Sequence, residues 1–358
     1  ASSSGARMPL DQRRSADAGG NDPLLRVQDL SVVFPTRKQR LVAVDEVSFN
    51  IQRGEILGVV GESGAGKSIT GNAVMSLIEP PGYVSGGGVY LDGERIDRLG
   101  ERALRQVRGQ RIGMIFQDPQ TSLNPLYSVG EQLVETITTH LPMSRRQARD
   151  RAVDLLTEVG IGSPESRVDS YPHQFSGGMR QRVVIALALC ADPDLVIADE
   201  PTTALDVSVQ AQILSLLKRL CRDRGTGVKL ITHDMGVIAE TADNVMVMYA
   251  GRVVERGPVD TVVHDPAHPY TAGLMDSIPP VERDVRRLTQ IPGSMPSLRA
   301  IPTGCAFHPR CPHAFERCRQ ERPDLMPAGD SQAACWLYAS HGDRGGGPEA
   351  VRRERRRH

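Results

Sequence analysis

From Leu25 to Ile51 the chain alternates apolar and polar residues, as in LRVQDLSVVF and VDEVSFNI. A period of two predicts antiparallel strands with one buried face. The following segment, ILGVVGESGAGKSITGNAVMSLI, has a continuous apolar run that breaks at glycines and resumes with helical spacing. We therefore expect a strand, a loop and a helix in that order.

The pattern changes to helical spacing from Asp118 to Tyr171, where SVGEQLVETITTHL and SRRQARDRAVDLLTEVGI predict a mostly α-helical insertion over about 118–172. The alternation of strands and helices then returns. DLVIAD and VKLITHD are short runs with apolar residues on both faces, which is typical of a parallel sheet covered by helices. The helical stripe between them consists of Val209, Ile213, Leu216, Leu217 and Leu220.

A closing hairpin is predicted by VMVMYAGRVVERG, with its turn at Ala250 and Gly251. After Pro258 proline becomes frequent and the periodicity fades, which predicts a domain boundary near residue 260. Both ends of the chain are polar, and the C-terminal end is basic, so we expect them to be disordered; weak attraction of the basic end to anionic lipid or RNA is the alternative. The predicted organisation is an arm over 1–23, an α/β domain over 24–258, an extension over 259–340 and a basic tail over 341–358.

The composition limits the classes of partner. The chain has 358 residues, of which 39% are apolar, and its 43 Lys and Arg residues balance 43 Asp and Glu residues. No global charge therefore favours nucleic acid or an anionic membrane. The longest apolar run, Val183 to Ala191, is far shorter than the ~20 residues that span a bilayer. Residues 1–23 contain no apolar signal core, so we expect a reducing cytoplasmic location in which cysteines bind metals more often than they form disulfides.

A nucleotide site is predicted at GESGAGKS, which fits G-x-x-x-x-G-K-[ST] between a predicted strand and a predicted helix. Such glycines let backbone N–H groups point at phosphate oxygens, while the helix N-terminus adds positive potential. Lys67 would reach the β- and γ-phosphates and Ser68 would hold Mg²⁺; a glycine-rich turn without a ligand is the alternative. The predicted ATP-binding residues in this stretch are Gly61, Glu62, Ser63, Gly64, Ala65, Gly66, Lys67, Ser68 and Ile69.

Two carboxylates end the predicted buried strand LVIADE. Because the carboxyl ends of parallel strands lie beside the ligand crevice, Asp199 would orient Mg²⁺. Glu200 would polarise the attacking water as a general base. The alternative is that both acids only cap a helix.

A second anion-binding surface is predicted at QFSGGMRQR. Ser176 can cap the following helix, and Gly177 and Gly178 leave backbone N–H groups free for an anion. A chain with one P-loop does not obviously need two such surfaces, which suggests a nucleotide held mainly by another subunit. Read alone, the segment could also be a flexible turn.

In order along the chain, GESGAGKS, MIFQDP, SGGMRQR, LVIADEP, TALD and LITHD resemble the ATP-binding subunits of ABC transporters over about residues 24–258. This resemblance implies an α/β P-loop ATPase with a mixed sheet core, an antiparallel β subdomain and an α-helical subdomain. It also implies two ATP molecules held head to tail between two subunits. Each ATP would face the P-loop of one subunit and the signature segment of the other.

Residue roles follow from the same resemblance. Gln117 corresponds to the residue that senses the γ-phosphate and Mg²⁺, His233 to the switch histidine, and Phe34 to the residue that stacks on adenine, although a strand Phe could equally belong to the core. Phe175 and Met179 depart from the common LSGGQ, but the intact Ser-Gly-Gly and Glu200 predict hydrolysis rather than binding without turnover. The implied signature set is Ser176, Gly177, Gly178, Met179 and Asp206. The implied Mg²⁺ set is Ser68, Gln117 and Asp199.

Longer phrases such as YPHQFSGGMRQRVVIALAL, MYAGRVVERG and HPYTAGLM resemble the ATPases of bacterial oligopeptide and dipeptide importers over about residues 24–338, a group that also includes nickel importers. The resemblance implies a heterodimer with a second ATPase, two transmembrane permease subunits and an extracytoplasmic peptide-binding protein. The chain would lie peripherally on the cytoplasmic face of the inner membrane, without nucleic acid. Nickel or another small solute is the alternative cargo. A soluble ABC ATPase acting on nucleic acid or ribosomes is the rival class, but the chain has neither a second ATPase domain nor a long coiled coil.

Four cysteines lie close together in the predicted extension, separated by five, six and sixteen residues: Cys305, Cys311, Cys318 and Cys335. Zinc usually needs a C-x2-4-C pair, which is missing, whereas a four-iron cluster is wider. The resemblance also favours a [4Fe-4S] cluster; zinc, disulfides and unliganded thiols remain alternatives. His308 and His313 are possible alternative ligands, and Cys190 and Cys221 lie in apolar helical stretches as expected for small buried residues.

A metal centre would also stabilise the fold of the extension. The extension is rich in proline and poor in apolar runs, so it can hardly form a core of its own. Metal binding can supply the missing folding free energy. We therefore expect a structural role for the centre, with redox or iron-linked regulation of transport as the alternative.

Overall fold

A computed structural model describes residues 22–202, 205–277 and 290–339. The expected N-terminal arm, up to residue 21, and the expected basic tail lie outside the described residues. Thr203 and Ala204 of the TALD motif also lie outside them. The domain boundaries named above stay predictions.

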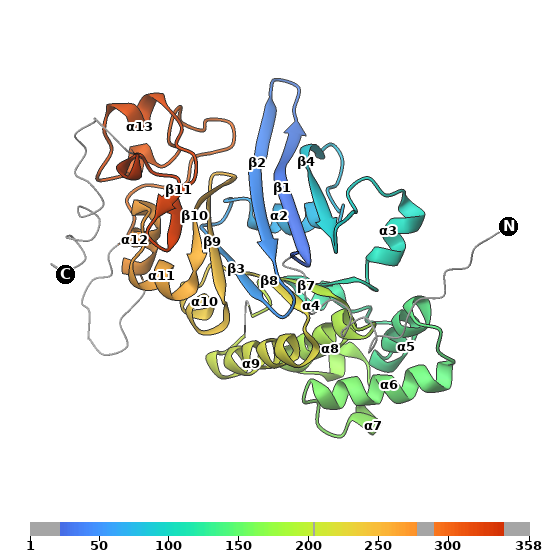
Figure 1. The fold of residues 1–358 in the computed structure, drawn as a ribbon. Helices are drawn as coiled ribbons and strands as arrows, with labels where there is room; N and C mark the ends of the chain where they lie inside the picture. The colour runs from blue at the N-terminus through green and yellow to red at the C-terminus, as the bar shows by residue number, and fades with distance from the viewer. Residues whose placement is uncertain (1–21, 203–204, 278–289, 340–358) are drawn as a thin grey trace.

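Two β-sheets form the framework of the described part of the chain (Figure 1). The smaller sheet is antiparallel in the order β2-β1-β4-β5, with β1 (Leu25–Pro35), β2 (Arg40–Ile51), β4 (Tyr83–Leu91) and β5 (Glu94–Arg95). The larger sheet has the order β11-β12-β10-β9-β3-β8-β7-β6, with β3 (Ile56–Val60), β6 (Ile112–Ile115), β7 (Leu195–Asp199), β8 (Gly227–Ile231), β9 (Asn244–Tyr249), β10 (Arg252–Pro258), β11 (Met326–Ala328) and β12 (Ser331–Ala333). Its strands from β9 to β6 are parallel, so their carboxyl ends share one edge.

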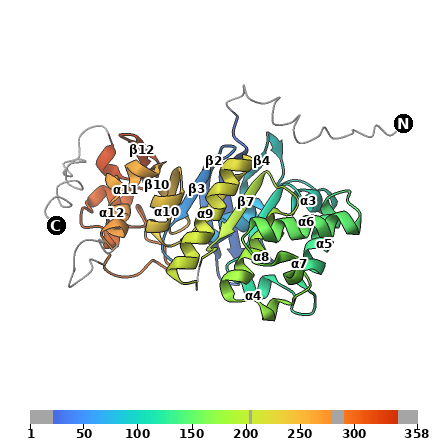
Figure 2. The same cartoon turned by 90° about the horizontal axis from the view of Figure 1, so that it is seen from below.

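Helices cover the larger sheet on both sides (Figures 1 and 2). The helix α2 (Lys67–Val74) contacts strands of both sheets and therefore lies between them. The core on the other face involves α8 (Gly177–Leu189), α9 (Val207–Arg224) and α10 (Met235–Thr241). The remaining helices are α3 (Glu101–Val107), α4 (Pro119–Ser122), α5 (Val129–His140), α6 (Arg145–Glu158), α7 (Pro164–Arg167), α11 (Val259–His264), α12 (Pro269–Asp276) and α13 (Glu316–Gln320), with short 3₁₀ turns at Pro172–Gln174, His308–Arg310 and Trp336–Tyr338.

Most elements predicted from periodicity are present. The two helices predicted in the insertion are α5 and α6, and each begins with a capping box, formed by Ser128 and Ser144 respectively. The predicted hairpin is β9 and β10, and its turn residues Ala250 and Gly251 both have positive φ. The predicted fold class is confirmed for its α/β core, its antiparallel β region and its helical region, whereas the small Cys-rich C-terminal module that was part of the same prediction is not supported.

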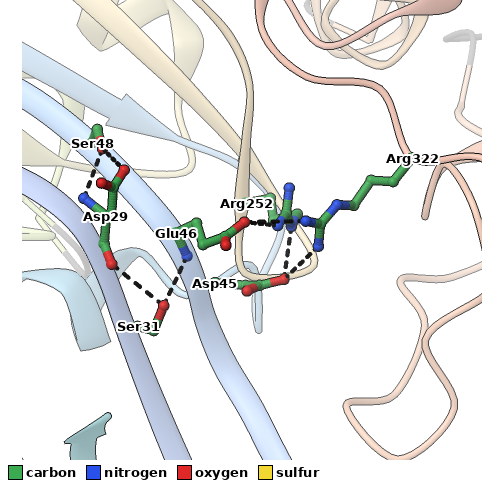
Figure 3. A network of polar contacts seen from close by, with 7 residues as sticks. All are labelled: Asp29, Ser31, Asp45, Glu46, Ser48, Arg252 and Arg322. Atoms are coloured by element: carbon green, nitrogen blue, oxygen red, sulfur yellow. Dashed lines mark hydrogen bonds and ion pairs between the residues drawn. The ribbon is translucent and has the colours of Figure 1, made fainter. Parts of the chain in front are cut away.

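The C-terminal extension is joined to the larger sheet. Its strand β12 pairs antiparallel with β10, where Glu255 faces Ala333. A second contact lies on the smaller sheet: Asp45 and Glu46 of β2 bind both Arg252 and Arg322, the latter from the extension (Figure 3). The extension therefore packs on the ATPase domain instead of standing apart from it.

One buried cation interrupts the apolar core of the sheet. Lys229 in β8 is 0% exposed, its ammonium donates to the Thr70 hydroxyl of α2, and it lies 5.2 Å from the ring centroid of Phe49. Burial lowers the pKa of Lys229 to about 7, although the charge of Asp199 acts in the opposite direction. The unfolded chain, with a lysine pKa of about 10.4, holds this proton over a pH range in which the folded chain has released it.

This difference predicts a pH-dependent stability. Because the unfolded state binds more protons between pH 7 and pH 10, the free energy of unfolding should rise with pH, by about 2 kcal/mol from pH 7 to pH 9 for this group. Lys229→Met should remove that rise and stabilise the protein at pH 7 by about 1–3 kcal/mol, because Thr70 still donates to the Lys67 carbonyl. Urea unfolding of the nucleotide-free chain at pH 7, 8 and 9 measures both effects. The exposed Lys218→Met is the control, and an equally steep rise in Lys229→Met would contradict the assignment.

Candidate nucleotide site and cysteine pocket

The predicted phosphate-binding loop runs from the end of β3 to the start of α2. Gly66 caps the helix at φ 100°, where a Cβ atom would approach the Ala43 carbonyl oxygen to 2.8 Å, so this position requires glycine. Lys67 Nζ donates to the carbonyl oxygens of Gly61 at 2.7 Å and Glu62 at 3.1 Å. Burial lowers the pKa of Lys67, while the nearby carboxylates, Glu200 foremost, act to raise it. The loop thus brings a cation and the start of a helix to one place.

Two of the three predicted Mg²⁺ ligands touch each other. Ser68 Oγ donates to Asp199 Oδ1 at 3.0 Å, which joins the start of α2 to the end of β7. Burial raises the pKa of Asp199, and the hydrogen bond from Ser68 counteracts that shift. Hydroxyl and carboxylate oxygens are donors that suit Mg²⁺. The third predicted ligand, Gln117, contacts Glu200 instead of Asp199.

The three predicted catalytic residues meet at one carboxylate. Gln117 Nε2 donates to Glu200 Oε2 at 2.9 Å, and His233 Nδ1 lies 3.3 Å from Glu200 Oε1. Glu200 has φ 47°, a conformation that costs a non-glycine residue about 1–3 kcal/mol. Its N–H donates to the Ile231 carbonyl of β8 at 2.9 Å, which holds it there. The loops that carry Gln117 and His233 therefore converge on the side chain that is the predicted general base.

The predicted signature residues begin two other helices. Ser176 Oγ accepts from the Met179 N–H at 3.3 Å and caps α8, and Asp206 caps α9. Gly178 is needed for packing, because a Cβ atom there would lie 2.7 Å from Val209 Cγ1, whereas a Cβ at Gly177 would meet nothing within 4 Å. The start of α8 therefore offers an open backbone surface.

Phe34 is the remaining residue of the predicted ATP set. It lies near the end of β1, is partly buried, and its ring faces Gly82, where a Cβ atom would come within 2.4 Å of the ring. This packing accounts for Phe34 as a structural residue. Its stacking on adenine stays a prediction.

The structure adds two residues that the sequence patterns missed. The Tyr270 hydroxyl accepts from the backbone N–H of Glu62 at 2.9 Å, and Arg310 binds the Glu62 carboxylate through two hydrogen bonds. They follow Glu62 by 208 and 248 residues. No local signal could have linked them to the loop.

The four clustered cysteines line one pocket in the extension. Phe307, Trp336 and Leu337 complete much of its wall. The six cysteines, all of which lie within the described residues, form no disulfide bond, so the disulfide alternative is not realised. The four that line this pocket are Cys305, Cys311, Cys318 and Cys335.

Cys318 is buried, and Cys305, Cys311 and Cys335 are partly buried. Burial raises the pKa of the Cys335 thiol to about 12, and the nearby Cys311, Cys305 and Cys318 add to that shift. His308 Nδ1 lies 2.9 Å from the Cys305 carbonyl oxygen, so this ring is engaged with backbone. Among residues 22–202, 205–277 and 290–339, no three or more His, Cys, Asp or Glu side chains are arranged to hold a metal ion.

Comparisons with known proteins divide the chain in two. The ABC transporter family matches residues 44–203, and the C-terminal region of oligopeptide/dipeptide transporters matches residues 254–318. In the part of the chain that the structure describes, no helix is long and apolar enough to cross a membrane.

Similar proteins cover almost the whole chain. The oligopeptide transport ATP-binding protein OppD of Bacillus subtilis (strain 168) is 48% identical over 93% of this chain and 94% of its own length. The dipeptide transport ATP-binding protein DppD of Escherichia coli (strain K12) is 47% identical over 87% of this chain and 96% of its own length. Among solved structures, the dimeric post-hydrolysis state of the ATP-binding cassette MJ0796 bound to ADP and Pi has a TM-score of 0.60 at 29% identity, covering 66% of this chain and 98% of that one.

Proposed function

The chain belongs to the ATP-binding subunits of ABC transporters for oligopeptides and dipeptides, and we propose that its ATP site works through the residues brought together around Glu200. The protein is an ATPase that energises peptide import. One observation carries the assignment of the site: Gln117 and His233 both contact the carboxylate that follows β7. Such a cluster suits a group that takes a proton from an attacking water.

Each side chain then has a distinct task in hydrolysis. Lys67 and the loop N–H groups bind the β- and γ-phosphates. Ser68 and Asp199 would hold Mg²⁺, which supplies charge neutralisation for phosphoryl transfer when bound. Glu200 orients and deprotonates water, while Gln117 and His233 fix the Glu200 side chain and sense whether a γ-phosphate is present.

The second phosphate-binding surface acts on a partner's nucleotide. The capped start of α8, with Ser176 and an open Gly177, presents backbone N–H groups to an anion. In a head-to-tail dimer this surface would close over ATP held by the P-loop of a second ATPase. We propose a heterodimer that docks on two permease subunits at the cytoplasmic face of the membrane, and that receives peptide from an extracytoplasmic binding protein.

Reconstitution tests this assignment. The chain, its second ATPase, the two permeases and the binding protein are assembled in lipid nanodiscs, and ATP hydrolysis is measured with and without peptides of two to five residues. We expect peptide to stimulate hydrolysis and Ni²⁺ to have no effect. Stimulation by Ni²⁺ alone would replace peptide with nickel as the cargo, and hydrolysis unaffected by either would remove the importer assignment.

The cysteine pocket is proposed to hold a [4Fe-4S] cluster. Four thiolates around a four-iron cluster are more widely spaced than ligands around a single ion. The four cysteines that line one pocket support this proposal, although among the described residues no three or more His, Cys, Asp or Glu side chains are arranged to hold a metal ion. The extension's own apolar core is small, consisting of Ala267, Ala328 and Ala333, so a bound centre would stabilise it.

A further inference from the structure

The C-terminal extension contacts the phosphate-binding loop at two points and lies near it at a third. The Tyr270 hydroxyl of α12 accepts from the Glu62 N–H, and Arg310 pairs with the Glu62 carboxylate. The Met295 sulfur lies 4.0 Å from the position that a Cβ atom would take on Gly64. These residues come from three separate segments of the extension, so its position is linked to the shape of the loop.

Arg310 holds the Glu62 carboxylate through two hydrogen bonds. Its Nη1 donates to Glu62 Oε2 at 2.7 Å and its Nη2 to Oε1 at 3.0 Å, a two-pronged pair that fixes the carboxylate in direction as well as distance. Arg310 is only 8% exposed. The Glu62 side chain is 32% exposed, so the pair is partly shielded and is screened less than a pair between two fully exposed side chains.

The other side of the guanidinium is held just as firmly. Its Nε donates to the Pro292 carbonyl at 2.8 Å, and Nη1 lies 3.4 Å from the Tyr249 hydroxyl. Tyr249, Tyr270 and Phe307 pack edge to face or tilted around it, with ring centroids 4.7–5.4 Å apart. Arg310 therefore cannot swing away from Glu62 without breaking several contacts, and it transmits the position of the extension to the loop.

We propose that Arg310 is a positioning residue of the ATP site, which acts through Glu62 to hold the phosphate-binding loop in its binding shape. This inference rests on the proposed role of residues 61–68 in binding phosphate. The extension is then a part of the nucleotide site rather than an appendage. Without the pair, the loop N–H groups and Lys67 must be ordered by ATP itself, and that cost lowers affinity.

The test compares variants of the full-length chain. We expect Arg310→Gln to raise the KM for ATP and the Kd of a fluorescent ATP analogue about tenfold, equal to about 1.4 kcal/mol, while kcat at saturating ATP stays within about twofold. Arg310→Lys keeps the positive charge but cannot form the two parallel hydrogen bonds to the Glu62 carboxylate, so it should bind ATP more tightly than Arg310→Gln and less tightly than wild type. A merely structural role would lower the melting temperature without moving KM.

Matched variants make the result specific. Arg322→Gln removes another arginine pair between the extension and the ATPase domain, on Asp45 and Glu46 rather than the loop, and should leave KM unchanged. Glu62→Gln should raise KM as Arg310→Gln does, and the double variant should be no worse than either single one, since both break one interaction. An unchanged KM in Arg310→Gln, an equal rise in Arg322→Gln, or additive effects in the double variant would each overturn the proposal.

A comparison of wild type with Lys67→Ala tests the assignment of the phosphate-binding loop separately from the proposed role of Arg310. If wild type binds the analogue and Lys67→Ala loses at least about tenfold in affinity, the phosphate-binding loop is correctly identified. The Arg310 series then decides the inference alone. If Lys67→Ala binds as wild type does, the loop assignment fails, and the Arg310 proposal fails with it.

Discussion

Replacing Glu200 by glutamine is expected to lower ATP turnover by about 10²–10⁴-fold while ATP binding remains intact. Glutamine matches glutamate in shape but cannot accept the proton of the attacking water. The new amide keeps one oxygen that can accept from one of the two partners, and its NH2 group can donate to the other, through Gln117 Oε1 or an unprotonated His233 Nδ1, so the loops that converge there should stay in place. ATP should therefore bind and hold the dimer closed, and the chain should stop at that stage.

Two measurements check this outcome. Steady-state phosphate release gives turnover, and size-exclusion chromatography with ATP detects a trapped dimer with the partner ATPase. Glu101→Gln makes the same chemical change on the exposed helix α3, where the carboxylate pairs with Arg108, and should leave both readings at the wild-type level. Turnover that is unchanged in Glu200→Gln would remove the general-base role.

The chemistry-bearing segments could be predicted because their signals are local. A glycine-rich loop between a strand and a helix, or an acid after a buried strand, is visible within ten residues, and such patterns located Lys67, Ser68, Asp199 and Glu200. Gln117 and His233 enter the predicted site only through the resemblance to a known family, because they lie on separate loops, and their convergence on Glu200 is a finding of the structure. Local pattern and family together therefore predict the members of the site, and the structure shows which of these residues are in contact.

What the sequence could not reveal depends on long-range packing. The pattern VKLITHD predicts a strand that is buried on both faces, but it does not predict which side chains surround Lys229. In the same way, the residues around FHPRC do not indicate that Arg310 binds Glu62. The sequence predicts an extension after a boundary near residue 260 but not that its strand β12 pairs with β10 or that Phe307 joins the large core. Prolines and glycines interrupt periodicity in that segment, so its pairing partners leave no trace in the local sequence.

Replacing Cys335 by serine is expected to abolish most of the iron bound by the extension. Wild-type protein purified without oxygen should carry about four irons per chain and absorb broadly near ~400 nm. Serine leaves three thiols in the pocket, too few for the full ligand set of a four-iron cluster. Because metal binding supplies folding free energy, the extension should lose about 3 kcal/mol or more of stability and unfold before the ATPase domain.

The single tryptophan of the chain reports on this pocket independently of enzyme activity. Trp336 lines the pocket beside Cys335, and its indole N–H donates to the Glu321 carbonyl at 2.9 Å. Its fluorescence should be weak in the iron-loaded protein, since an adjacent absorbing cluster takes up the excitation energy, and should increase in Cys335→Ser or after chelation of iron. Cys190→Ala, which changes a cysteine buried in the main core, should keep both the iron and the weak fluorescence. Colourless wild-type protein with one zinc per chain, or iron content unaffected by Cys335→Ser, would rule out the cluster, because either result means that the four thiols do not act together as its ligands.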